Sequence, residues 1–357
     1  MDSRPKSFLS VTPGVSEPPS VTTPKVGVSR PRLSFDEYVQ GIFRGDRMIL
    51  AKAITLIESA RPQDNELAQK IIQACLPKAG NSLRIGITGV PGAGKSTFLE
   101  SLGTRLAKDG VRLAVLAVDP SSALSGGSIL GDKTRMEQLS ACENAFIRPS
   151  PSRGSLGGVA RRTRETMILC EAAGFRVIFV ETVGVGQSET LVHGMIDFFL
   201  LLMIAGAGDE LQGIKRGIIE MADMMVINKA EGDNLQRAQA TRQEYASARH
   251  MFPARADGWL PPVLTCSSLT GTGIMEVWET IKSFEQQAKK SGSFDANRRS
   301  QRVQWLTQTV EHDLLMEFWN DPRVQEQLAT VREQVESGDL YSGYAARKLV
   351  NLFRNRP

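Results

Sequence analysis

One short run of residues has the composition and spacing of a phosphate-binding loop. It fits the pattern G-x-x-x-x-G-K-[ST] and consists of Gly89, Val90, Pro91, Gly92, Ala93, Gly94, Lys95, Ser96 and Thr97. Glycines let a backbone wrap closely around phosphate groups, so that N–H groups point at the anion, and a following helix adds the positive end of its dipole. We expect Lys95 to reach the β- and γ-phosphates of a nucleotide and the Ser96 hydroxyl to ligate Mg²⁺.

The flanking residues predict the two elements between which such a loop lies. Residues 83–88 have the apolar character of a short buried strand. After the loop, apolar residues recur at helical spacing before the stop signal Gly110, namely Phe98, Leu99, Leu102 and Leu106. A chance glycine turn would lack this context, so strand, loop and helix together favour a site for nucleotide phosphates.

Acidic residues stand at the ends of two predicted strands, where open parallel sheets bind their ligands. They are Asp119 and Glu181, and both are candidate ligands of Mg²⁺. Asp132, in a glycine-rich polar stretch over residues 125–135, is a further candidate for holding the metal or positioning a water. Asp119 could instead cap a turn through its side chain, and Asp132 could be an ordinary solvated charge.

Glu181 opens a Glu-Thr-Val-Gly segment that looks like the D-x-x-G element of GTPases, with Glu in place of Asp. In that element the carboxylate holds Mg²⁺, often through water, and the N–H of the glycine, here Gly184, senses the γ-phosphate. Phosphoryl transfer depends on a positioned water more than on a strong base. Gln187 does not lie at the usual spacing of a water-orienting glutamine, so the choice between Glu181 and Asp132 stays open.

The segment Asn228-Lys229-Ala230-Glu231 follows another predicted strand and resembles the N-K-x-D motif that selects guanine. The acidic residue of that motif accepts hydrogen bonds from guanine N1–H and the 2-amino group. Adenine has neither donor there, so an unpaired buried carboxylate would penalise ATP. The segment Cys266-Ser267-Ser268-Leu269 stands where GTPases place a backbone contact to guanine O6. We therefore expect GTP as substrate, although Glu replaces Asp and a plain polar turn is the alternative.

Apolar runs that alternate with helical periodicity predict the elements that hold these residues. Strands are expected over residues 83–88, 113–118, 176–180, 198–204, 224–227 and 262–265. This order predicts an α/β fold of the P-loop NTPase type, in three layers (α/β/α) with a mostly parallel sheet and right-handed crossovers. The predicted divisions are a disordered tail over 1–33, a helical segment over 34–80, the nucleotide domain over 81–288 and a helical arm over 289–357.

The carboxyl-terminal arm shows apolar residues near heptad spacing. They are Val303, Leu306, Val310 and Leu314, and then Val324, Leu328, Val331 and Val335. An arm that cannot bury such a stripe alone favours a homodimer, with packing on the chain's own domain as the alternative. Basic and polar residues over 289–300 predict a linker before the arm, and residues 148–158 are expected to be flexible.

Composition narrows the class of protein. The chain has 357 residues, of which 41% are hydrophobic and 23% charged, as in ordinary soluble globular proteins. A net charge of +4 is too small to indicate a nucleic-acid partner. The most apolar run, residues 198–205, is too short to span a membrane.

The cysteines and histidines are dispersed, without any C-x-x-C pair. A dedicated zinc or nickel site is therefore not expected, and the cysteines are typical of core thiols in a reducing compartment, which favours a cytoplasmic protein. Basic residues outnumber acidic ones in the amino-terminal tail, as in a transit peptide, but its prolines would interrupt an amphipathic helix.

Several stretches together resemble the MeaB/ArgK family of P-loop GTPases, the family of the methylmalonic aciduria type A protein. They are residues 89–97, 117–122, 126–136, 181–189, 206–215 and 228–231, and the likeness extends roughly over 34–350. The resemblance implies a homodimeric GTPase that chaperones an adenosylcobalamin-dependent acyl-CoA mutase, chiefly methylmalonyl-CoA mutase, by gating cofactor loading and rescuing inactivated enzyme. Cobalamin itself is expected on the mutase or its adenosyltransferase.

The resemblance also implies a switch segment over residues 206–215, with Asp209, Gln212 and Lys215 as its active members. The sequence alone indicates only a loop before a helix there. Two other functions stay open: an ATP-dependent kinase or transport-associated ATPase, for which no kinase catalytic loop is present, and a metal-delivery GTPase, which would need a Cys/His cluster.

Overall fold

The strand before the glycine-rich loop lies in the middle of a parallel sheet. In the computed structural model, seven strands follow the order β3-β2-β4-β1-β5-β6-β7, and each neighbouring pair is parallel. Their bounds are β1 (Leu83–Thr88), β2 (Leu113–Val118), β3 (Ala145–Arg148), β4 (Val177–Thr182), β5 (Phe198–Ile204), β6 (Met224–Asn228) and β7 (Val263–Thr265). The structure describes residues 33–59, 61–118, 136–149, 156–182, 188–206, 216–248 and 257–354.

The sequence of a strand that has helices on both faces is a continuous apolar run, because neither face of the strand contacts water. Strand β5 (Phe-Phe-Leu-Leu-Leu-Met-Ile) is the clearest case and is buried along almost its whole length. Strand β3 is not among the predicted strands. It has only four residues and pairs with β2 alone, so it lacks the long apolar run by which a central strand is found.

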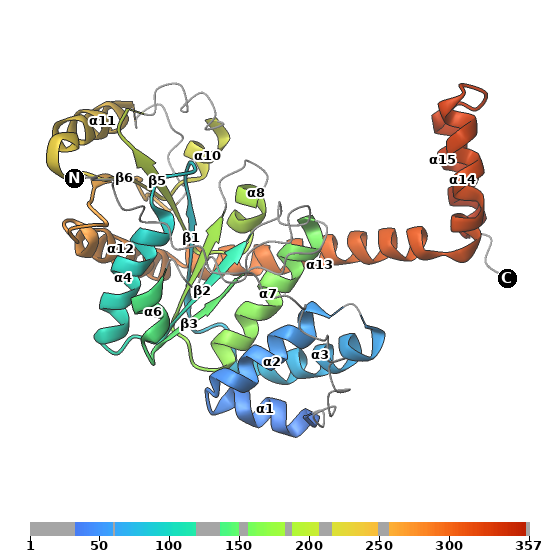
Figure 1. Cartoon of the computed structure of the whole chain (residues 1–357), viewed down its shortest axis with the longest axis horizontal. Coiled ribbons are helices and arrows are strands. Elements are labelled where there is room, and N and C mark those ends of the chain that lie inside the picture. The colour runs from blue at the N-terminus through green and yellow to red at the C-terminus, as the bar shows by residue number, and fades with distance from the viewer. Residues whose placement is uncertain are drawn as a thin grey trace, which may run out of the picture. The chain divides into compact units, whose positions relative to one another are not determined.

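Helices cover both faces of the sheet (Figure 1). Helices α4 (Lys95–Lys108), α6 (Glu137–Ala141) and α12 (Ile274–Ser291) lie on one face, and α7 (Leu156–Ala172) and α8 (Ser188–His193) lie on the other. Helix α10 (Arg216–Met221) contacts α8 and β5, and α11 (Leu235–Ala248) follows the short η3 turn (Gly232–Asn234) and contacts β6 and β7. The predicted three-layer α/β/α fold is confirmed.

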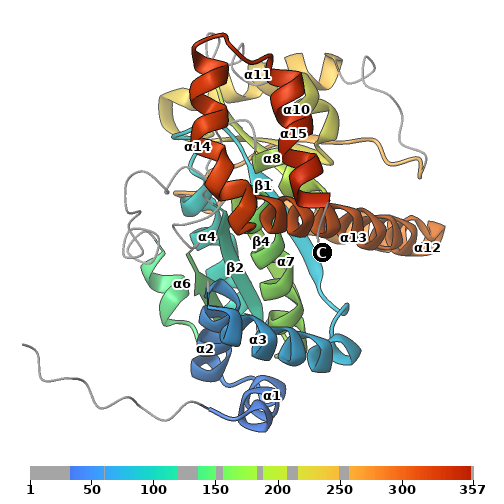
Figure 2. The same ribbon diagram turned by 90° about the vertical axis from the view of Figure 1, so that its right-hand side faces the viewer.

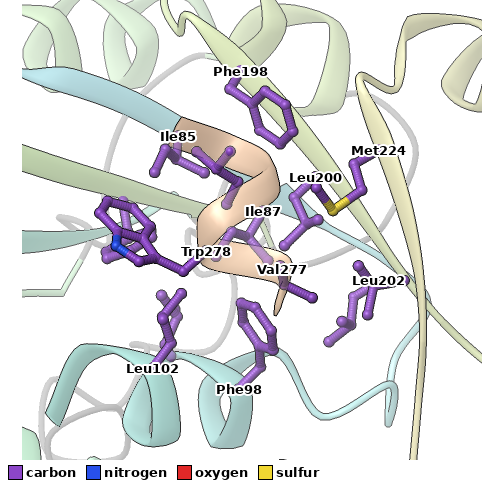
Figure 3. Close-up of a cluster of buried hydrophobic side chains, with 14 of the residues drawn as sticks. Ile85, Ile87, Phe98, Leu102, Phe198, Leu200, Leu202, Met224, Val277 and Trp278 are labelled. Atoms are coloured by element: carbon purple, nitrogen blue, oxygen red, sulfur yellow. The ribbon is translucent and has the colours of Figure 1, made fainter. Parts of the chain in front are cut away.

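The main core fills the space between the sheet and the helices α4 and α12 (Figure 3). Ile85 and Ile87 of β1 lie there with Phe98 of α4 and Val277 of α12, all without solvent exposure. Burying one such side chain contributes about 1.5–3 kcal/mol. This packing fixes β1 and α4, and therefore the two ends of the loop between them.

Three helices precede the sheet and pack on α7. They are α1 (Phe35–Phe43), α2 (Arg47–Glu58) and α3 (Pro62–Cys75), followed by the turn η1 (Leu76–Lys78). The Asp46 side chain caps α2 by accepting hydrogen bonds from the backbone N–H groups of Met48 (2.8 Å) and Ile49 (3.1 Å). The predicted amino-terminal helices are present.

The carboxyl-terminal helices are α13 (Ser293–Asn320), α14 (Pro322–Glu336) and α15 (Ser342–Arg354). Most of the predicted linker over 289–300 is helical instead: α12 ends at Ser291, Gly292 takes a φ of +77°, and α13 begins at once. The polar composition predicted a solvated linker, but Arg298 is buried and paired with the carboxylate of Asp197. In the second apolar stripe, Val324 and Val331 are buried against α15 of the same chain.

Several predictions concern residues outside the described ranges. They are the tail up to residue 32, the segment 125–135, most of 148–158 and the switch segment from residue 207 to 215. Within the described part of the chain, the helices are too short or too polar to cross a lipid bilayer.

Candidate functional site

The glycine-rich loop connects β1 to α4 and has the backbone that its glycines allow. Gly92 and Gly94 take positive φ angles of +78° and +88°, which other residues rarely adopt. A side chain at Gly89 would place its Cβ 2.1 Å from the Leu202 carbonyl oxygen, and one at Gly94 would place it 2.7 Å from Asn228 Nδ2. The loop therefore needs glycine for its turns and for its close contacts with neighbouring strands.

Lys95 begins helix α4 and is 8% exposed. Its Nζ donates hydrogen bonds to the carbonyl oxygens of Gly89 (2.7 Å) and Val90 (3.2 Å). Burial lowers the pKa of Lys95 below its usual value, and the negative charges of Glu181 and Glu189 oppose that change. The ammonium group is therefore held over the loop, where its partners are carbonyl groups that a phosphate could replace.

Ser96 and Glu181 come from different elements and meet beside the loop. Ser96 Oγ donates to Glu181 Oε1 over 2.9 Å. The neighbouring Thr182 hydroxyl donates to Thr88 Oγ1 over 2.9 Å, and both threonines are buried, so the ends of β4 and β1 are joined. A hydroxyl and a carboxylate are oxygen donors of the kind that Mg²⁺ prefers, and the pair therefore fits the ion.

Asn228 lies at the end of β6 and contacts two loops at once. Its Nδ2 donates to the Ala93 carbonyl oxygen (2.8 Å), and its Oδ1 accepts from the N–H (3.1 Å) and hydroxyl (2.8 Å) of Ser268. The residue is 1% exposed. This side chain therefore positions the phosphate loop against the Ser268 segment, and its predicted contact with the nucleotide stays a prediction.

The rest of the predicted base-selecting motif leaves one acceptor unused. Lys229 is exposed and has a φ of +59°, and the Ala230 N–H is bonded to the Cys266 carbonyl oxygen. Glu231 Oε2 is buried and accepts no hydrogen bond from any described residue. A buried carboxylate oxygen without a donor is costly, and guanine offers the two donors that such a group needs.

The segment after β7 (Val263–Thr265) is closed by its own hydrogen bonds. Ser267 Oγ accepts from the Thr270 N–H over 3.0 Å, and the Ser267 N–H donates to the Thr272 carbonyl oxygen over 2.9 Å. Leu269 is exposed, and with Ser268 and Thr97 it lines a pocket of about 530 Å³. The three segments with predicted contacts to phosphate, metal and base therefore lie around one region at the carboxyl edge of the sheet.

Four predicted site residues lie outside the described ranges: Asp119, Asp132, Gly184 and Lys215. Their roles stay predictions. Glu189 of α8 was given no role, yet its buried carboxylate acts on Lys95; nothing in its local spacing marks it. Among the described residues no cluster of three or more His, Cys, Asp or Glu side chains is arranged to hold a metal.

Comparison with known proteins adds independent information. A family model for the methylmalonyl-CoA mutase-associated GTPase MeaB matches residues 50–323. GTPase ArgK of Escherichia coli is 51% identical over 279 residues, which are 78% of this chain and 84% of that protein. The mouse protein named methylmalonic aciduria type A homolog, mitochondrial, is 46% identical over 331 residues, covering 90% of this chain and 80% of that one.

A solved structure agrees with these relatives. It is named as a LAO/AO transport system kinase, is 40% identical and has a TM-score of 0.69, and the match covers 90% of this chain and 98% of that one. A probable GTPase of Mycobacterium tuberculosis is 49% identical over 308 residues, covering 86% of this chain and 92% of that protein. The chain therefore belongs to the MeaB family, a family of P-loop proteins that hydrolyse GTP.

Proposed function

We propose that this GTPase requires Mg²⁺ and serves an adenosylcobalamin-dependent acyl-CoA mutase of the methylmalonyl-CoA mutase type. It gates loading of the mutase's cofactor and protects or reactivates the mutase. The partner is supported by the description of the matching family and the name of the mouse relative. The nucleotide is supported most directly by the unpaired buried oxygen of Glu231.

At the phosphate end, the proposed work of the chain is to position the triphosphate and neutralise its charge. The loop from Gly89 to Thr97 surrounds the phosphates with N–H groups, and the start of α4 adds a positive dipole. Lys95 exchanges its carbonyl partners for phosphate oxygens. The loop N–H groups, the helix dipole and the Lys95 ammonium group all stabilise the negative charge that develops during phosphoryl transfer.

Ser96 and Glu181 would hold the metal ion, through their oxygen atoms. When bound, Mg²⁺ neutralises charge on the β- and γ-phosphate oxygens. Asp119 and Asp132 are proposed as further members of this site. Glu181 or Asp132 orients the attacking water. Because both are also proposed at the metal, Glu181→Gln and Asp132→Asn are compared at saturating Mg²⁺, and the variant that still binds Mg²⁺ and GTP but loses hydrolysis identifies the water-orienting residue.

At the base end, Glu231 accepts hydrogen bonds from guanine N1–H and the 2-amino group, beside Asn228 and Lys229. The Ser267-Ser268-Leu269 segment supplies a backbone contact to guanine O6. Adenine would leave Glu231 unpaired, so ATP should bind more weakly. The alternative function, an ATP-dependent kinase or transport-associated ATPase, makes the opposite prediction; the related solved structure is named as a transport system kinase. Equal or tighter binding of ATP than of GTP, measured by calorimetry in Mg²⁺, would exclude the guanine assignment.

The mutase partner is tested by a pull-down. The purified chain, loaded with GDP or with a non-hydrolysable GTP analogue, is mixed with a cobalamin-dependent acyl-CoA mutase. We expect capture that differs between the two nucleotides, because loops that sense a γ-phosphate order or release a segment; Gly184 and the segment with Asp209, Gln212 and Lys215 are proposed to do so. Failure to capture the mutase with either nucleotide would contradict the chaperone function.

A homodimer is proposed through the first apolar stripe of the arm. Val303, Leu306, Val310 and Leu314 of α13 are 66%, 66%, 49% and 54% exposed, although their spacing matches a helix–helix interface. Leu306→Glu should convert a dimer to monomers in sedimentation experiments. Leu260→Glu, at another exposed apolar residue, is the matched control and should leave the dimer intact.

A cytoplasmic location is proposed from the cysteines. The four cysteines, all within the described residues, are free thiols. Burial raises the pKa of Cys75 to about 11 and that of Cys266 to about 12, as expected of unreactive core thiols. Such residues suit a reducing compartment.

A further inference from the structure

A pocket at the opposite edge of the sheet contains a buried arginine that pairs with no carboxylate in the described part of the chain. The pocket has a volume of about 250 Å³ and lies between η1, the start of β1, α7 and α13. Helix α13 crosses α7 at this place (Figures 1 and 2). Strand β1 has six residues, and the rise from its first residue to its last, at about 3.3 Å per residue, puts roughly 17 Å between this pocket and the phosphate loop.

Two of the arginines in the pocket lining are neutralised. Arg84 forms two hydrogen bonds with Glu171, of 2.9 and 3.0 Å. Arg298 forms two with Asp197, of 2.7 and 2.6 Å. Glu171 also accepts from the Gly80 N–H and the Ser82 hydroxyl. These carboxylates are therefore already surrounded by donors.

Arg164 is the exception. It is 6% exposed, and its guanidinium donates to the Gln308 amide oxygen (2.8 Å) and the Gly194 carbonyl oxygen (3.3 Å), both of them neutral. Among the residues that the structure describes, no carboxylate pairs with it; the neighbouring Glu165 is bonded to Arg161 and Gln69. Burial, together with the positive charge of Arg84, lowers the pKa of Arg164.

A buried and unpaired charge is costly, by several kcal/mol even after relaxation. A guanidinium also has five N–H donors in a planar fork that fits a carboxylate. Trp305, whose ring centroid is 5.9 Å from the Arg164 guanidinium carbon, has a buried indole N–H that donates to no described acceptor. Glu171 also lines the pocket, but its carboxylate is paired with Arg84. Among the described residues, Arg164 therefore lacks a negatively charged partner and the Trp305 N–H lacks an acceptor.

The remaining lining decides which anion fits. Ile168, Met195 and Trp305 give the pocket an apolar wall, and a second cavity of about 250 Å³ shares Arg164 and Trp305 with it. Among the described lining residues, Arg164 is the buried arginine that pairs with no carboxylate, whereas Arg302 is exposed. One such charge suits a monoanion with an apolar body better than a dianionic phosphate.

We propose that this pocket binds a small organic carboxylate, which pairs with Arg164 and lays its apolar chain against Ile168, Met195 and Trp305. The site is distinct from the nucleotide site and does not depend on the identity of the partner mutase. The same carboxylate chemistry could come from an Asp or Glu side chain on a second copy of the chain, and the test separates the two sources.

The test uses calorimetry on the full chain without nucleotide. Butyrate and hexanoate are the probes, hexanamide is the neutral match for hexanoate, and inorganic phosphate is the dianion. We expect hexanoate to bind at least about tenfold more tightly than hexanamide or phosphate, because a hydrogen bond to a charged group contributes about 1.5–3 kcal/mol. Arg164→Gln should lose at least about tenfold in affinity, and Arg164→Lys less.

Two further variants keep the test independent of folding defects. Ala79→Phe fills the pocket without removing a charge and should also abolish hexanoate binding. Arg299→Gln changes an exposed residue of α13 outside the pocket lining and should leave hexanoate binding unchanged. GTP hydrolysis within about twofold of wild type would show that Arg164→Gln is folded. Hexanoate binding that is unchanged in Arg164→Gln would overturn the proposal.

The two sources of the carboxylate give different results. If no free carboxylate binds, but Arg164→Gln and Ala79→Phe weaken self-association at least tenfold in sedimentation while Arg299→Gln does not, a side chain of a second copy occupies the pocket. If neither free carboxylates nor self-association respond to these variants, the pocket does not recognise a carboxylate.

Discussion

The two ends of strand β1 hold polar groups in opposite states. At its carboxyl end, Lys95 contacts only carbonyl oxygens of its own loop among the hydrogen bonds described, and Glu231 has an oxygen that accepts from no described residue. At its amino end, Arg84 and Arg298 each meet a carboxylate through two hydrogen bonds. The first arrangement leaves bonding capacity for a ligand, and the second uses its capacity within the protein.

This difference separates what the charges do. Charges that are fully paired inside the protein hold together segments far apart in sequence, such as α13 and the start of β5. Buried polar groups with replaceable or missing partners do not stabilise the fold and are available for binding. Substitutions at the carboxyl end should therefore change activity, and substitutions of the paired charges Arg84 and Arg298 at the amino end should change stability.

The largest effect is expected from Lys95→Ala. GTP hydrolysis should fall on the order of 10²- to 10³-fold, because the variant loses a preorganised positive charge at the phosphates. The melting temperature should change little, since the hydrogen bonds between Lys95 and described residues all lie within its own loop. Steady-state hydrolysis and calorimetry measure the two quantities, with Lys290→Ala, at an exposed lysine of α12, as the control. Turnover at the wild-type rate would mean that hydrolysis occurs elsewhere.

Arg298→Ala should have the opposite profile. Removing one partner of a buried ion pair costs about 3–5 kcal/mol, because Asp197 is left buried and unpaired. Denaturant unfolding measures this loss, and Arg299→Ala is the exposed neighbour for comparison. Hydrolysis per folded molecule at low temperature should be unchanged. A strong loss of activity in folded Arg298→Ala would contradict the separation of the two ends.

Glu231→Gln tests the unused acceptor. The affinity for GTP should fall by about 1.5–3 kcal/mol, because a charge-assisted hydrogen bond is lost, and the affinity for ATP should not fall. Glu231→Asp keeps the charge and should retain the preference for GTP. Calorimetry with both nucleotides gives the ratio, and equal losses for GTP and ATP would show that Glu231 does not select the base.

The smallest expected effect is the pH dependence of the protein's stability that arises from the Glu171 carboxyl group. Burial acts to raise the pKa of this carboxyl, but Arg84, Ser82 and Gly80 outweigh it and hold the pKa below its ordinary value of 4.5. The stabilisation is therefore present above pH 4.5 and is lost as the pH falls through the lower, folded-state value. A tenfold change in the acid dissociation constant between the unfolded and folded states corresponds to about 1.4 kcal/mol of stability.

Melting temperatures from pH 7 to pH 3 measure this dependence. The gap between wild type and Glu171→Gln should narrow toward low pH, because protonation removes the same charge in the wild type. A constant gap across that range would show that Glu171 stabilises the protein by packing rather than by its charge.

The sequence predicted best what depends on neighbouring residues. The loop, its strand and its helix are adjacent in the chain, so their spacing predicts their geometry. The positions of Glu181 and Asn228 followed from a general rule, since strand ends of a parallel sheet share one edge. Their roles in binding remain predictions, and the observed Ser96–Glu181 and Asn228–Ser268 contacts support them.

Features that depend on distant pairs escaped prediction. Arg298 and Asp197 are 101 residues apart, and nothing local marks either as buried, so a polar linker was expected where α13 begins. Strand β3 is short and lies at the sheet edge, where the apolar signal is weakest. Arg164 was also missed, because an arginine within a helix ordinarily faces water.

The Asn228 amide joins the two ends of the proposed ligand site. One nitrogen holds the Ala93 carbonyl and one oxygen holds Ser268, so any movement of the Ser268 segment is transmitted to the phosphate loop through a single rigid group. Bare tripolyphosphate, which has no base to hold that segment, should leave the loop less ordered than GTP does. The nucleoside would then contribute to the rate of hydrolysis, although the reaction takes place at the other end of the nucleotide, at the γ-phosphate.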